Sequence, residues 1–255
     1  MVNEQTMQKL YAMRLGAMAM AWQEQQGEAK LAKLSFDERF GLLVDAEHIA
    51  RDNRRLKRLL KQAQLRFPHA CLEDVEASKK RGLERSLLHE LGSGAWLGKH
   101  HGVLITGQTG VGKSYLGCAL GQLACRRGRR VLYRRIPRLL DELALAKAEG
   151  SYRKTLAKIA KVDLLIIDDL GMGSGLKEAQ RQDLLEVLDD RYAARSTVVT
   201  SQLPVKHWHE WIGDPTLADA ILDRLVHNAY RVELKGPSRR GDEQPAEEET
   251  SAAES

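Results

Sequence analysis

The stretch that decides the fold is GQTGVGKS, Gly107 to Ser114. Its glycines allow tight turns that point several backbone N–H groups into one hollow. Lys113 would reach the β- and γ-phosphates of a nucleotide, and the Ser114 hydroxyl would coordinate Mg²⁺. A chance glycine-rich turn is the alternative, but VLIT before the loop is typical of a strand and SYLGCALGQLACRRG after it of a helix. The predicted contacts of the nucleoside triphosphate are Gly107, Gln108, Thr109, Gly110, Val111, Gly112, Lys113, Ser114 and Tyr115.

A second motif, LLIIDDL from Leu164 to Leu170, is an apolar strand that ends in two carboxylates. Asp168 would hold Mg²⁺ through water, and Asp169 would orient the water that attacks the γ-phosphate. An acid pair on a solvated loop is the alternative. The four apolar residues directly before the pair argue against it.

From about residue 100 the chain alternates short apolar runs with amphipathic helical patterns, which is typical of a parallel sheet covered on both faces. This predicts an α/β fold, a P-loop NTPase with a five-stranded parallel sheet flanked by helices. The expected strands are 103–106, 131–136, 162–167, 197–200 and 230–234.

The first 66 residues have the pattern of a small all-α domain. Apolar residues from Met7 to Trp22 recur at helical spacing and predict one helix that ends near Gly27. Ser35 and Glu38 form a capping box, and a long helix should follow it until Pro68. Its expected apolar stripe consists of Phe40, Leu43, Val44, Leu56, Leu59 and Leu60.

Basic residues are concentrated in two places. Seven lie between Arg51 and Arg66 against the single acid Asp52, and seven arginines lie between Arg126 and Arg138 with no acid. Such clusters suit the phosphates of duplex DNA and give salt-dependent binding with little sequence information. A solvated charged face is the alternative for the first cluster, and salt bridges at an interface are the alternative for the second. The predicted DNA contacts are Arg51, Arg54, Arg55, Lys57, Arg58 and Lys61 in the first cluster and Arg134, Arg135 and Arg138 in the second.

The last segment, 241–255, carries six acids and no base, so it should be disordered. No run of about 18 apolar residues and no basic-then-apolar N-terminus occurs, so neither a membrane span nor a secretory signal is expected. Three cysteines without a CxxC pair fit thiols in a reducing compartment. The expected location is the cytoplasm.

Taken together, these stretches resemble the DnaC-like AAA+ ATPases, and among them the IstB-type transposition helper proteins of insertion sequences. The resemblance runs from about Met7 to Arg240. LSFDERF before the phosphate loop and DRLVHNAYRVEL after it are more specific than the loop itself.

The resemblance implies a role for further residues. Gly107 to Ser114 match the Walker A loop, and Asp168 and Asp169 match the Walker B acids, although the wider AAA+ class has Glu where Asp169 stands. Gln202 falls at the sensor I position, where Asn is more common. Arg224 aligns with the arginine finger that reaches a neighbouring subunit's ATP. Arg240 in GPSRR matches the sensor II arginine, but Arg239 replaces the usual tyrosine, so either arginine could contact phosphate.

For function, the resemblance implies an ATPase that oligomerises on target DNA, remodels it, and recruits and stimulates a partner transposase. The alternatives are a replicative helicase loader, since DnaC-like cores serve both, and a DNA clamp that binds ATP without hydrolysing it. The expected domains are a helical DNA-binding and assembly domain at 1–66, the ATPase domain at 67–240 and the acidic tail at 241–255.

Overall fold

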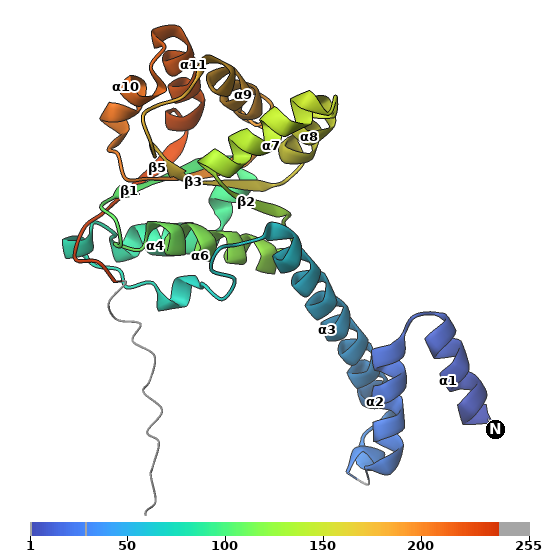
Figure 1. Ribbon diagram of the computed structural model, residues 1–255. Coiled ribbons are helices and arrows are strands. Elements are labelled where there is room, and N and C mark those ends of the chain that lie inside the picture. The colour runs from blue at the N-terminus through green and yellow to red at the C-terminus, as the bar shows by residue number, and fades with distance from the viewer. Residues whose placement is uncertain (1, 29, 240–255) are drawn as a thin grey trace, which may run out of the picture. The chain divides into compact units, whose positions relative to one another are not determined.

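The computed structural model describes residues 2–28 and 30–239 (Figure 1). The predicted tail 241–255 and Arg240 lie outside the described residues. The helices are α1 (Val2–Ala12), α2 (Gly16–Gly27), α3 (Phe36–Ala63), α4 (Arg85–Ser93), α5 (Ala95–Gly98), α6 (Lys113–Arg126), α7 (Ile136–Ala148), α8 (Tyr152–Ala160), α9 (Glu178–Asp189), α10 (Trp208–Ile212) and α11 (Pro215–Val226). The strands are β1 (Gly102–Gly107), β2 (Val131–Arg135), β3 (Leu164–Leu170), β4 (Ser196–Ser201) and β5 (Ala229–Leu234).

The five strands form one parallel sheet in the order β2-β3-β4-β1-β5, which confirms the predicted architecture. All seven residues of β3 are buried, as expected for a central strand covered on both faces. Because the strands are parallel, β1, β3 and β4 end at the same edge of the sheet. The phosphate loop after β1 and the acids at the end of β3 therefore lie at one edge, with the end of β4 between them.

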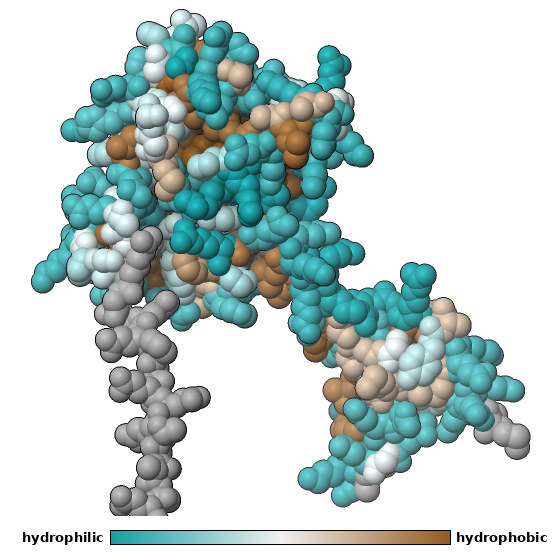
Figure 2. Space-filling view, in the orientation of Figure 1, coloured by the Kyte–Doolittle hydropathy of each residue, from teal (hydrophilic) through white to brown (hydrophobic). Residues whose placement is uncertain are grey.

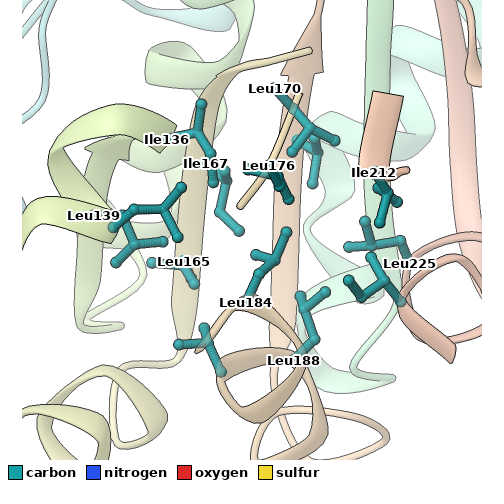
Figure 3. Packing of buried hydrophobic residues seen from close by; sticks show 14 of the residues in the cluster. Ile136, Leu139, Leu165, Ile167, Leu170, Leu176, Leu184, Leu188, Ile212 and Leu225 are labelled. Carbon is teal, nitrogen blue, oxygen red and sulfur yellow. The ribbon is translucent and has the colours of Figure 1, made fainter. Parts of the chain in front are cut away.

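Helices α7 to α11 cover one face of the sheet, and α4 and α6 lie on the other (Figure 1). The first face carries the main apolar core, in which Leu165 and Ile167 of β3 meet Leu139 of α7 and Leu184 of α9 (Figure 3). These side chains are 0% exposed. Alternation along β3 then turns Asp168 toward the opposite face, where α6 packs.

Two glycines let α6 approach the sheet closely. A Cβ on Gly117 would lie 3.3 Å from Thr200 Cγ2, and one on Gly121 would lie 2.7 Å from Ile166 Cδ1 and 2.9 Å from Leu65 Cδ2. Helix α6, which begins in the phosphate loop, is thus seated directly against β3 and β4.

The N-terminal segment is helical, as predicted, but the prediction of a single helix up to Gly27 is wrong. The chain turns between α1 and α2, where Arg14 adopts a positive φ of 60°. A new helix can begin here because the Glu47 carboxylate accepts hydrogen bonds from the backbone N–H groups of Ala17 (2.9 Å) and Met18 (3.2 Å). These are donors that an uncapped helix would leave unsatisfied.

The capping box that begins α3 is confirmed. Glu38 N–H donates to Ser35 Oγ (3.3 Å), and Ser35 N–H donates to the Glu38 carboxylate (2.8 Å). The predicted apolar stripe is correct only toward the end of the helix, where Leu59 is buried. Nearer its start, Phe40 and Val44 are 50% and 42% exposed.

The chain divides into two compact units between Arg58 and Leu59, inside α3. The N-terminal unit contains α1, α2 and most of α3, and the ATPase unit, defined here as the residues from Leu59 onward, contains the sheet. Within the residues that the structure describes, no helix has the length and apolar character needed to cross a membrane.

Candidate nucleotide-binding site

The loop between β1 and α6 has a conformation that only glycine supports at two of its positions. Gly107 has φ 145°, and a Cβ there would overlap the Leu234 carbonyl oxygen of β5. Gly110 has φ 87°, and a Cβ there would overlap the Ser238 hydroxyl. Helix α6 begins at Lys113, directly after Gly112. A glycine loop that ends in a helix N-terminus is a ready site for an anion such as a phosphate.

Lys113 and Ser114 connect this loop to the rest of the site. The Lys113 side chain is buried, and its Nζ donates to the Gln108 carbonyl at 2.8 Å, across the loop. Ser114 Oγ donates to Asp168 Oδ1 at 2.8 Å. The structure therefore brings together the lysine, the hydroxyl and the carboxylate that the sequence predicted from separate motifs.

Asp168 is fully buried at the end of β3, with a partner on several sides. Besides Ser114, Thr200 Oγ1 of β4 donates to its Oδ1 (2.5 Å), and the Tyr133 hydroxyl of β2 donates to its Oδ2 (2.5 Å). Arg66 Nη1 forms an ion pair with Oδ2 at 3.9 Å. Burial, together with the bond to Asp168, raises the pKa of Tyr133, so the phenol remains a donor.

Sequence reasoning did not place Arg66, Tyr133 or Thr200 in this site. A signal for Tyr133 and Thr200 existed, since each is a polar residue near the carboxyl end of an expected strand, where parallel strands converge. Arg66 has no such signal, because it lies in a loop that only the tertiary fold brings to β3.

Asp169 lies beside the site but is engaged elsewhere. It has a positive φ of 62°, and its backbone N–H donates to Thr200 Oγ1 (3.1 Å). Its carboxylate pairs with Arg135 at 2.9 Å. Arg135, predicted as a DNA contact, is thus bound to the acid predicted to orient the lytic water.

Two further arginines hold the outside of the phosphate loop. Arg81 donates to the Val111 carbonyl at 3.0 Å, and Arg239 N–H donates to the Gly110 carbonyl at 3.0 Å. The Arg239 guanidinium pairs with Glu76. Burial, with the nearby charge of Arg239, lowers the pKa of Arg81. Arg81 is another residue that sequence reasoning missed.

The remaining predicted site residues lie at the end of β4, on α11 and on α6. Gln202 directly follows β4 and is exposed. Arg224 is on α11, where its Nε donates to Asp189 Oδ1 of α9 at 2.6 Å, a bond that raises the pKa of Arg224. Tyr115 lies in the first turn of α6, and its hydroxyl donates to Asp74 (3.4 Å).

The model of the family described as IstB-like ATP binding protein matches residues 8–246. The chain belongs to this family.

Relatives of similar length are found among insertion-sequence proteins. The ATP-binding protein y4pL of Sinorhizobium fredii (strain NBRC 101917 / NGR234) is 49% identical over 94% of this chain and 97% of its own length. The ATP-binding protein of insertion sequence IS1162 from Pseudomonas fluorescens is 50% identical over 80% of this chain and 88% of its own. These proteins are named for ATP binding, as the family is, and also for insertion sequences.

Solved structures support the AAA+ P-loop fold. A crystal structure of DnaI aligns with a TM-score of 0.56 at 25% identity and covers 72% of this chain and 93% of DnaI. The DnaC helicase loader aligns with a TM-score of 0.55 at 18% identity and covers 67% of this chain and 99% of DnaC. The second likeness shows the fold alone.

In this IstB-like chain, the residues present fit ATP and a divalent cation. Gly107 and Gly110 let the phosphate loop lie close to Leu234 and Ser238, and the loop leads into the N-terminus of α6, which suits a phosphate. Ser114 Oγ and Asp168 Oδ1 are 2.8 Å apart and supply the hard oxygen donors that Mg²⁺ prefers in P-loop proteins.

The residues predicted to contact DNA fall into two groups. Six are exposed along α3, although Arg51 and Arg54 both pair with Glu47, at 2.9 and 3.0 Å. In the second cluster, Arg134 pairs with Glu142 at 2.9 Å and is mostly buried, and Arg138 is exposed on α7. Among the predicted DNA contacts, the second half of α3 therefore exposes more basic side chains to solvent than the second cluster does. The six residues on α3 are Arg51, Arg54, Arg55, Lys57, Arg58 and Lys61.

Proposed function

We propose that this IstB-like protein is an ATP-dependent, DNA-binding regulator of insertion-sequence transposition. It hydrolyses ATP with Mg²⁺, oligomerises on duplex DNA in the cytoplasm, remodels the DNA, and recruits and stimulates a partner transposase. The observation that carries the proposal is the direct bond between Ser114 and Asp168 at the mouth of a glycine loop, in a chain of this family.

In the nucleotide site, each predicted residue is given a role, and the contacts of Ser114 and Asp168 support theirs. Lys113 binds the β- and γ-phosphates, and Ser114 and Asp168 hold Mg²⁺, which neutralises charge that develops on the phosphoryl oxygens. Asp169 orients the attacking water, and Gln202 supports that water from the end of β4. Arg239 or Arg240 contacts phosphate on the subunit's own nucleotide.

Arg224 completes the site of a neighbouring subunit. Its side chain is 31% exposed, so it can be reached from outside the chain. Within the monomer it is paired with Asp189, and a γ-phosphate would have to replace that carboxylate. This exchange makes hydrolysis dependent on assembly, because the arginine stabilises transition-state charge only when a second copy supplies it.

For DNA, we propose that the helical segment 1–66 supplies the main contacts through α3 and that 67–240 forms the ATPase domain. The exposed basic side chains of α3 bind DNA phosphates without contacting the nucleobases. A second surface consists of Arg134, Arg135 and Arg138 and binds phosphates in the same way. Several copies on one duplex would add their weak contacts through effective concentration. Site preference would then come from how easily the DNA deforms.

A second candidate function is a DNA clamp that binds ATP without hydrolysing it. The Arg135 ion pair with Asp169 favours it, since the water-orienting carboxylate is engaged. A helicase loader has only the likeness of fold in its support. A transposition regulator should stimulate the transposase, whereas a helicase loader should stimulate a replicative helicase, so measuring both activities separates these two roles.

The decisive experiment combines turnover with assembly. ATP hydrolysis is measured with and without duplex DNA, and the same samples are imaged by electron microscopy. Arg224→Ala should bind ATP but not hydrolyse it, and mixing it with Asp169→Asn should restore part of the activity at mixed interfaces. Assembly without phosphate release would favour the clamp, and a solitary chain in the presence of ATP and DNA would contradict the proposal.

A further inference from the structure

Arg66 contacts the carboxylate on which the proposed magnesium site depends. Its Nη1 lies 3.9 Å from Asp168 Oδ2. The Asp168 side chain is 0% exposed, whereas that of Arg66 is 41% exposed. A buried carboxylate is stable in its charged form only when it is paired and hydrogen-bonded. The hydroxyls of Ser114, Tyr133 and Thr200 supply the hydrogen bonds, and Arg66 supplies a positive charge.

The position of Arg66 is fixed by its neighbours in the chain. Leu65 is buried, with Cδ2 2.9 Å from where a Cβ on Gly121 of α6 would lie. The Phe67 ring packs against that of Tyr115, with the ring centroids 6.0 Å apart. The Arg66 guanidinium itself lies over the Phe67 ring, 5.4 Å from its centroid. Gln64 accepts a hydrogen bond from Arg134 (2.7 Å). The segment 64–67 is therefore bound along α6 and β2, and it holds the guanidinium at Asp168.

A cation held by Ser114 and Asp168 would share this carboxylate with Arg66. Ser114 is bonded to Oδ1 and Arg66 faces Oδ2, so the two positive charges would lie on the two oxygens of one buried group. Two positive charges on the two oxygens of one carboxylate repel each other, and the repulsion is stronger near a protein interior than in water. By this argument Arg66 would stabilise the Asp168 carboxylate in the absence of metal and would disfavour the metal.

We propose that Arg66 is a positioning residue that opposes Mg²⁺ at Asp168, so that metal binding weakens the contact between Arg66 and Asp168. The inference rests on the proposed function, because it assumes that Asp168 serves a Mg²⁺–ATP site. Since Arg66 follows the end of α3 by a short loop, binding of Mg²⁺ and ATP then loosens one of the contacts that hold this loop against the sheet.

The test measures how much Mg²⁺ the full chain needs in order to bind nucleotide, without DNA. A fluorescent ATP analogue is titrated at a series of free Mg²⁺ concentrations, and binding is also measured in EDTA. In Arg66→Gln, which removes the charge and keeps much of the side chain, the Mg²⁺ concentration for half-maximal binding should fall about fivefold. Binding in EDTA should stay at the level of the unmodified protein.

Three comparisons make the test specific. Arg66→Lys keeps the charge and should restore the original Mg²⁺ requirement, which a merely structural role would not predict. Arg153→Ala removes one exposed charge from α8 and should leave the requirement unchanged. Arg66→Ala provides a second neutral variant if Arg66→Gln does not fold.

Two results would overturn the inference while nucleotide binding persists. One is an unchanged or higher Mg²⁺ requirement in the neutral variants, and the other is equal behaviour of Arg66→Lys and Arg66→Gln. If the unmodified protein bound no nucleotide at any Mg²⁺ concentration, the proposed function would fail together with this inference.

Discussion

The two units of this chain are stabilised in different ways. In the ATPase unit, apolar side chains from both faces of the sheet are buried, including Leu165 and Ile167 on one face and Ile166 on the other, all at 0% exposure. In the N-terminal unit, only Ala19 and Glu47 are buried among the described residues up to Arg58. One unit thus has a large apolar core, whereas the other is organised around a carboxylate.

The exposed surface of the N-terminal unit is correspondingly apolar in places (Figure 2). Phe36 is 70% exposed and stacks on Phe40, which is 50% exposed. A small helical unit with so few buried apolar groups gains little from the hydrophobic effect. We therefore expect substitutions of buried apolar residues to matter in the ATPase unit and substitutions of charged residues to matter in the N-terminal unit.

The largest expected effect is the loss of nucleotide binding in Lys113→Ala. Its charge is buried at the phosphate loop, and truncating one partner of a buried charge pair costs about 2–5 kcal/mol. ATP affinity should fall at least tens of times, measured by isothermal titration calorimetry. The N-terminal unit should keep its α2 hydrogen-exchange protection, because its stability does not depend on this loop.

Lys99→Ala, at an exposed lysine just before β1, is the matched control and should bind ATP normally. ATP-dependent assembly that persists in Lys113→Ala would mean that the loop is not the nucleotide site.

A pair of leucine truncations tests the contrast between the units directly. Leu165→Ala leaves a cavity in the core of the sheet and should lower the free energy of unfolding by about 2–5 kcal/mol. Leu42→Ala, at a leucine that is 45% exposed on α3, should cost less than about 1 kcal/mol. Calorimetric unfolding of both variants checks the difference. Equal losses would mean that the apolar surface of α3 is buried in the protein as it exists in solution.

Glu47→Gln should destabilise the N-terminal unit by about 1–2 kcal/mol, because the charged acceptor of Ala17, Met18, Arg51 and Arg54 is lost. Hydrogen exchange at the amides of α2 measures this. Burial of the Glu47 carboxyl would raise its pKa, but the bonds from Arg51, from the two amides and from Arg54 outweigh burial, so the pKa is lowered.

A lowered pKa in the folded state means that Glu47 stabilises the unit above its ordinary pKa of 4.5 and that this contribution disappears as the pH falls through the lower folded value. The difference between the unmodified protein and Glu47→Gln should therefore shrink below pH 4.5. Glu24→Gln, at an exposed acid of α2, is the control. A difference that is constant with pH would contradict the role of the carboxylate charge.

The sequence predicted the ATPase unit well because its signals are local. The spacing of Gly107, Gly110 and Gly112 is set within one loop, and the runs that became β1 and β3 alternate with helices in a way that only a covered parallel sheet satisfies. Lys113, Ser114 and Asp168 could therefore be placed at one edge of the sheet from the pattern alone.

What the sequence could not predict depends on contacts between distant residues. The break at Arg14 coincides with a cap supplied by Glu47, 30 residues from Ala17. Arg66 looked like part of a basic run and meets Asp168, and Arg135, which stays a predicted DNA contact, also pairs with Asp169. A charged residue gives the same sequence signal whether its partner is a solvent ion, a phosphate or a buried acid.

The smallest expected effect is on DNA affinity. It distinguishes the exposed basic residues of α3 from basic residues that are paired with acids within the chain. Replacing Lys57, Arg58 and Lys61 by glutamine should weaken duplex binding, because all three are exposed in the second half of α3. If each contacts a phosphate, the slope of log K against log salt should fall by about 0.9 for each charge removed. Binding isotherms at several salt concentrations give the slope.

A lower net positive charge of the protein would by itself weaken DNA binding, so the control must remove the same number of positive charges from another surface. Replacing Arg153, Lys154 and Lys158 on α8 by glutamine does this, since these residues are exposed too. If α3 provides the DNA-binding surface, the slope of log K against log salt should fall only for the variant of Lys57, Arg58 and Lys61. Equal changes in both sets would mean that DNA responds to the charge of the whole protein, and the contrast between the units would then apply to stability and not to DNA binding.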